Sequence, residues 1–131
     1  MSQKLPLVAR ILLGLVFTVF GLNFFLQFLP QPKMEPEAGA FLGALVAGKI
    51  LALVKVVEVG GGLALLAGQF VPLALALLAP VIVGIVLFHA VFDPAGLVIP
   101  LVIAAMAGFL AWAYRGAFAP MLQAKTEPGP R

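Results

Sequence analysis

The sequence predicts an all-α integral membrane protein built as a bundle of four transmembrane helices. Of its 131 residues, 63% are hydrophobic and only 10% are charged, whereas a soluble domain is about a quarter charged. Its mean hydropathy is +1.18, and its apolar runs are near the roughly 20 residues needed to cross a bilayer. No stretch alternates polar and apolar residues as a barrel strand would, so strands are not expected.

The first span is predicted at about residues 5–29, a run longer than the core of a signal peptide and without a small-residue cleavage site, so we expect it to be retained. Arg10 interrupts this run early. At 100° per residue, Gly14 and Gly21 share the helix face of Arg10, and small residues on one face allow a second helix to approach closely. By the same count, Asn23 points away from Arg10.

Residues 30–37 form the clearest predicted loop, because they hold three prolines and three charges. Residues 38–49 are apolar but too short to span a bilayer. They are expected to be either an interfacial helix or the entry segment of the second span, which is predicted at about residues 50–67.

A short turn leads to the third predicted span, about residues 71–92, in which Pro80 should kink the helix. A further turn precedes the fourth span, about residues 97–114. These spans define one predicted domain at residues 1–116, and residues 117–131 are expected to be a polar, frayed tail.

Four spans place both termini on one side of the membrane, and the basic residues decide which side. The opposite loops carry Lys33, Lys49, Glu35, Glu37 and Asp93. The terminal side carries Lys4, Arg10, Arg115, Lys125 and Arg131. The excess of lysine and arginine predicts that both termini are cytoplasmic.

A charged layer is predicted inside the membrane, where an ionisable side chain costs roughly 2.5–3.5 kcal/mol on insertion scales. Lys55 and Glu58 lie in the second span, and an Arg10–Glu58 pair with Lys55 one turn away is the pairing we favour. This group is interpreted either as a ligand or proton site, or as an ion pair that fixes helix register. In the second interpretation a run of glycines admits the neighbouring helix: Gly60, Gly61 and Gly62.

A second polar layer contains Asn23, His89 and Asp93. His89 and Asp93 are four residues apart and could share a proton or a metal, but no third strong ligand accompanies them, so no metal site is predicted. Asp93 precedes a proline and is expected to be a helix N-cap, and His89 to be structural. The single histidine excludes a bis-histidine haem within one chain, and the absence of cysteine excludes disulfides and a dithiol relay. The scattered cations form no phosphate-binding face, so nucleic acid is not an expected partner.

These residues together resemble the DoxX family of small bacterial membrane proteins. The resemblance rests on Ala9–Gly14 with Phe17 and Phe20–Gly21, the proline-containing loop, Lys55–Gly62, Leu65–Gly68 and the start of the third span at Pro72. It implies a four-helix bundle in the bacterial inner membrane. Some relatives are subunits of a thiosulfate:quinone oxidoreductase, and others associate with sulfurtransferase or superoxide-detoxifying partners.

Three functions are compatible with this sequence. The preferred one is a membrane subunit or anchor for a redox partner, with quinone as candidate cofactor. A quinone carbonyl could accept from Arg10 or Lys55 while Glu58 handles a proton, and the chain is not expected to be an enzyme by itself. The alternatives are a small-solute transporter or channel that works as a homo-oligomer, and a structural or assembly protein whose charges hold the bundle.

Overall fold

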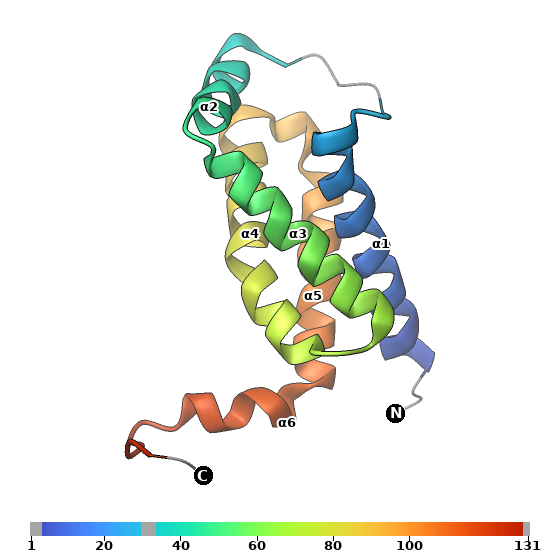
Figure 1. Ribbon diagram of the computed structural model, residues 1–131, viewed down its shortest axis with the longest axis vertical. Helices are drawn as coiled ribbons and strands as arrows, with labels where there is room; N and C mark the ends of the chain where they lie inside the picture. Colours follow the sequence, from blue (N-terminus) through green and yellow to red (C-terminus); the bar gives the residue numbers. More distant parts are fainter. Residues whose placement is uncertain (1–3, 30–33, 130–131) are drawn as a thin grey trace.

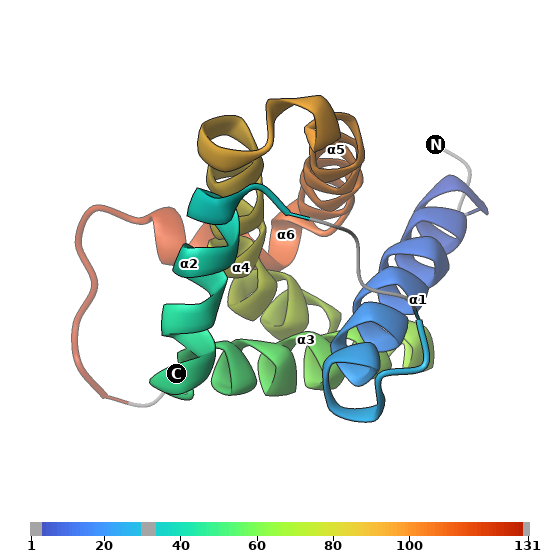
Figure 2. The ribbon, with the colours of Figure 1, turned by 90° about the horizontal axis from the view of Figure 1, so that it is seen from above.

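The computed structural model describes residues 4–29 and 34–129, where every regular element is a helix and there is no strand, so the all-α prediction is confirmed. Four long helices form a ring in which each packs against two others: α1 with α3, α3 with α4, α4 with α5, and α5 with α1 (Figures 1 and 2). Their bounds are Lys4–Leu26 for α1, Ile50–Ala67 for α3, Val71–Phe92 for α4 and Val98–Ala113 for α5.

The helix α1 ends three residues earlier than the predicted first span. Gln27 adopts a left-handed conformation with φ 54°, which ends the helix. The side-chain Oδ1 of Asn23 then accepts the backbone N–H of Leu29 at 2.7 Å and closes the turn. The second and third predicted spans, in contrast, have the same bounds as α3 and α4.

The helix α2 spans Pro36–Ala47 and is separate from α3, so this segment is not a continuous extension of the second span. Pro36 lies in its first turn, where the missing N–H costs nothing. Lys49, with φ 63°, turns the chain into α3. The ring of Phe41 stacks on Phe88 and Phe92 of α4 and fixes α2 at the end of the bundle opposite α6 (Figure 1). The predicted loop therefore ends before Pro36.

Three helices, α1, α3 and α4, are long and apolar enough to cross a membrane. The helix α5 has 16 residues, which gives a length of about 24 Å at 1.5 Å per residue. It passes the same test only together with residues 115–122, from which it is bent by 77°. The part of the chain that the structure describes therefore contains three candidate spans, or four if α5 crosses the bilayer, and the four-span topology stays a prediction.

The polar tail predicted at residues 117–131 begins with short helical elements, and residues 123–129 have no regular structure. Arg115–Phe118 form the short helix α6, and Ala119–Leu122 form the 3-10 helix η2. The segment turns away from the bundle (Figure 1) and exposes apolar side chains at its end. A third short element, η1 (Pro94–Gly96), lies in the turn between α4 and α5.

The closest helix contact joins α1 to α3 and depends on glycines. A Cβ added at Gly62 would lie 2.9 Å from the carbonyl oxygen of Gly14 and 2.5 Å from Oγ1 of Thr18, so only glycine fits there. Gly21 lies against Val59 of α3 in the same contact. Gly61 instead faces Leu78 of α4. The predicted packing glycine Gly60 does not belong to these contacts, because it is exposed and no atom lies within 4 Å of a Cβ built there.

Candidate functional site

Arg10 reaches from the start of α1 to the C-terminal end of α3. Its Nη1 donates to the carbonyl oxygen of Leu65 at 2.9 Å. The same carbonyl accepts the N–H of Gly68, and Gln69 donates to Ala64, which is the Schellman arrangement that ends many helices. A helix C-terminus carries partial negative charge and unsatisfied carbonyls, so a cation is favourable there. Arg10 therefore stabilises the end of α3.

Gly68 is required beside Arg10 for two reasons. Its φ of 72° is left-handed, and a Cβ at this position would overlap the Arg10 guanidinium. Any other residue would displace Arg10 or strain the turn. The sequence signal for this contact is the glycine just past the second span, and it was not connected with Arg10 by sequence reasoning.

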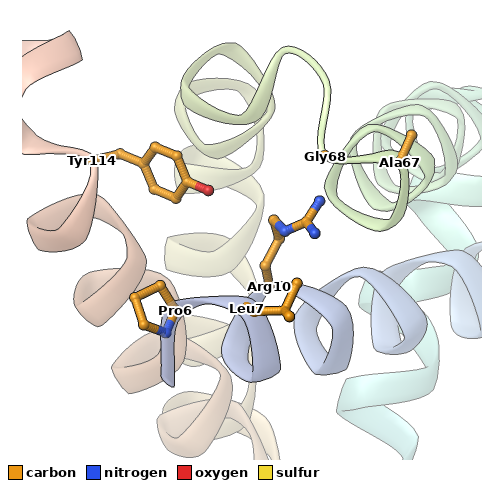
Figure 3. Close-up of a pocket in the computed structure, with 6 residues that line it drawn as sticks. All are labelled: Pro6, Leu7, Arg10, Ala67, Gly68 and Tyr114. Carbon is orange, nitrogen blue, oxygen red and sulfur yellow. The ribbon is translucent and has the colours of Figure 1, made fainter. Parts of the chain in front are cut away.

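The Arg10 pocket is open to the surface, has a volume of about 410 Å³ and lies at the same end of the bundle, between α1, the α3–α4 turn and the end of α5. In Figure 3 the guanidinium and the hydroxyl of Tyr114 both point into it. Within the described residues, the bond to Leu65 engages one of the five N–H groups of Arg10 and leaves the others for a ligand. Six residues line the pocket: Pro6, Leu7, Arg10, Ala67, Gly68 and Tyr114.

Glu58 forms a separate polar site in the middle of α3, before the end that Arg10 binds. Its Oε1 accepts Nζ of Lys55 at 3.3 Å, and Oε2 lies 3.3 Å from the same nitrogen. Glu58 is 3% exposed, and a Cβ built on Gly21 of α1 would lie 3.3 Å from its Cβ. The side chain of Lys55 is 21% exposed. The carboxylate is therefore closed in by α1, and its lysine partner lies nearer the surface.

The structure does not form the Arg10–Glu58 pair that the sequence favoured. Arg10 binds α3 at Leu65, which lies about 10 Å from Glu58 along the helix at 1.5 Å per residue. The terminal carbonyls of α3 give Arg10 a partner within reach, and Lys55 gives Glu58 one on its own helix. The predicted site of three charges is therefore two sites.

Thr18 is a buried polar residue that sequence reasoning missed. Its Oγ1 has no hydrogen-bond partner in the described parts of the chain. It lies at the α1–α3 contact beside Gly62, one helical turn along α3 from Glu58. A threonine in an apolar helix gives little signal, because its burial depends on which face meets the partner helix.

The second predicted layer is also divided. The side chain of Asn23 accepts the N–H of Leu29, and His89 Nδ1 donates to the carbonyl of Ile85 at 2.8 Å. Asp93 occupies the predicted N-cap position, before η1, but its side chain makes no capping hydrogen bond. His89 and Asp93 do meet beside Gly96, since a Cβ added to that glycine would lie 3.3 Å from Cδ2 of His89 and 3.3 Å from Cγ of Asp93.

No group of three or more potential metal-ligating side chains occurs within residues 4–29 and 34–129. A family model described as DoxX matches residues 5–90, from the start of α1 to near the end of α4. The whole of α5 and Tyr114, which follows it, lie beyond this match. No curated protein and no solved structure was found to match the chain.

Proposed function

The chain belongs to the DoxX family, and its apolar helices make it a multi-pass membrane protein; from this we propose that it is a membrane subunit that holds a quinone headgroup for a redox partner. In this proposal α5 is the fourth span and the membrane is the bacterial inner membrane. Both chain ends then face the cytoplasm, on the side that carries most of the lysines and arginines.

The observation that carries the proposal is the Arg10 pocket. Its volume of about 410 Å³ lies in the range of small-molecule sites, which combine apolar walls with a few placed polar groups. The ring of a quinone is flat and carries carbonyl acceptors. Arg10 offers N–H donors, and Tyr114 offers an aromatic ring and a hydroxyl, so the residues present fit this group.

A bound quinone would supply two-electron, two-proton carrier chemistry. The protein's own contribution is binding and orientation: Arg10 donates to an acceptor oxygen, and its bond to Leu65 holds the guanidinium in place. Because the chain contains no cysteine for a dithiol relay, the proposal assigns the supply of electrons to a partner subunit. Glu58 lies away from the pocket, so the proposal gives it no part in the proton chemistry of a quinone.

The test is labelling with a photoreactive quinone analogue in vesicles, after native mass spectrometry of the gently extracted protein has looked for a retained quinone. Arg10→Met should lower labelling about tenfold, since a hydrogen bond to a charged group contributes about 1.5–3 kcal/mol. Lys49→Met is the matched control, because Lys49 precedes the other end of α3 and does not line the pocket. Equal labelling of the two variants would refute the quinone proposal.

A structural role is the second candidate, and the burial of the Lys55–Glu58 pair supports it. A pair closed in by a neighbouring helix fixes helix register without needing a ligand. Solute flux through liposomes that is lost in Glu58→Gln would instead support the transporter alternative. Flux that is absent in both the original protein and this variant would leave the pair as a packing element.

A further inference from the structure

The segment after α5 carries exposed apolar side chains together with positively charged ones, and its end does not pack against the bundle. Leu122 is 82% exposed, more than any other large apolar side chain in the described residues, and Met121 is 67% exposed. Phe118, in contrast, packs back against the core. The segment is therefore attached to the bundle at its start and presents its end outward.

The direction of this segment follows from its bend. Residues 115–122 are turned by 77° from α5, so they run nearly across the bundle axis (Figure 1). If α5 crosses the bilayer, this direction lies in the plane of the membrane surface. Tyr114 is the residue at the bend, so the segment leaves the bundle beside the Arg10 pocket.

Charge and aromatic side chains at the bend suit a membrane interface. Arg115 donates to the carbonyl of Trp112 at 2.9 Å, and its guanidinium carbon lies 4.4 Å from the centre of the Trp112 ring. Tryptophan and tyrosine are enriched at the level of the lipid headgroups. Lys125 follows the segment, and Glu127 is the acidic residue near it.

We propose that residues 115–122 form an in-plane anchor that binds the surface of a bilayer containing anionic phospholipid. Met121 and Leu122 enter the boundary of the acyl chains, and Arg115 and Lys125 lie among the phosphates. Apolar insertion combined with basic residues is how interfacial segments bind anionic membranes. The anchor also fixes Tyr114, one wall of the Arg10 pocket.

The absence of cysteine allows a clean test in the full-length protein. A single Leu122→Cys substitution, at an exposed position, carries an environment-sensitive fluorophore in vesicles of phosphatidylcholine with phosphatidylglycerol. We expect blue-shifted emission that is quenched by nitroxide lipids of headgroup depth and not by aqueous iodide. Pro128→Cys, further along the tail, is the matched control and should be quenched by iodide.

Other occupants give different results. A Leu122 probe that iodide quenches as strongly as the Pro128 probe would overturn the proposal. If the Leu122 probe is protected from iodide in native membranes but not in vesicles that contain this protein alone, a protein partner covers the segment. If protection depends on the protein-to-lipid ratio, a second copy of the chain covers it. Either outcome overturns a lipid anchor.

The anionic lipid is tested separately with Arg115→Gln and Lys125→Gln. Each cation near an anionic surface should shift the balance between bound and free segment about fivefold. The double variant should therefore lose most of the dependence of probe depth on phosphatidylglycerol content. An unchanged dependence would refute the role of these cations.

Discussion

Arg10 and Glu58 are both ionisable residues on facing helices of one bundle, and their surroundings differ. Arg10 of α1 lies beside the end of α3, bonds a terminal carbonyl, and borders an open pocket of about 410 Å³. Glu58 lies within α3, pairs with a lysine on the same helix, and is covered by α1. Charge inside a predicted span is thus the same sequence signal in both places.

The difference shows that the surroundings of a charged side chain in an apolar helix determine whether it can bind a ligand. A helix terminus offers unsatisfied carbonyls and leaves room beside them, so a cation there can stabilise the helix and still bind a ligand. A charge in the middle of a close helix contact has no such room. This difference is why the quinone proposal rests on Arg10 and the structural alternative rests on Glu58.

The largest expected effect is at the contact that closes in Glu58. Gly62→Ala would place a methyl group 2.7 Å from the backbone nitrogen of Thr18 and separate α1 from α3. We expect a loss of roughly 2–3 kcal/mol in the free energy of unfolding, as in overpacked cores, measured by unfolding in mixed micelles.

The control for this prediction is Gly60→Ala in the same glycine run, where a methyl group meets nothing within 4 Å. Alanine is the better helix former by about 0.5–1 kcal/mol, so this variant should be as stable as the original or slightly more stable. Equal losses at Gly60 and Gly62 would contradict a close contact between α1 and α3 at Gly62.

Removing one member of the Lys55–Glu58 pair should have the next largest effect. Glu58→Gln or Lys55→Met leaves a charge without its partner and should cost about 1–2 kcal/mol, within the range for a buried polar group that loses its bond. The variant that carries both substitutions should be at least as stable as the less stable of the two single variants. Fully additive losses would show that the two residues do not interact.

Arg10→Met should cost about 1 kcal/mol, because one hydrogen bond to the end of α3 is lost. Combined with Glu58→Gln, its effect should be additive, since sites more than about 7–10 Å apart without shared partners rarely couple. A thermal unfolding series of the single and double variants measures this. Stability losses that are far from additive would show that Arg10 and Glu58 interact, contrary to the structure.

The smallest effect is expected at the turn beside the Arg10 pocket. Phe70 adopts a left-handed conformation with φ 55° and is exposed. Phe70→Gly relieves the steric cost of this conformation, but it also raises the conformational entropy of the unfolded chain, which offsets part of the benefit. We therefore expect the free energy of unfolding to rise by less than about 1 kcal/mol, measured by thermal unfolding. Phe70→Ala keeps the Cβ and is the control; equal gains would mean that side-chain exposure, not backbone conformation, is responsible.

The sequence by itself determined the helical fold, the family and the positions of α3 and α4. These follow from long apolar runs with proline and glycine at their ends, and such signals are local. The end of α1 was missed because it depends on Asn23 bonding Leu29. The helical segment after α5 was missed because it is short and runs into the polar, Pro/Gly-rich stretch of residues 125–131.

Only the tertiary structure decided which charges meet. Depth in a bilayer can be counted along a sequence, but the partner of Arg10 depends on where α3 ends relative to α1, and on a backbone carbonyl that no side-chain pattern reveals. Tyr114 joined the pocket for the same reason, since α5 closes the ring against α1. Contacts between helices far apart in the chain arise from packing, and packing is not a local property.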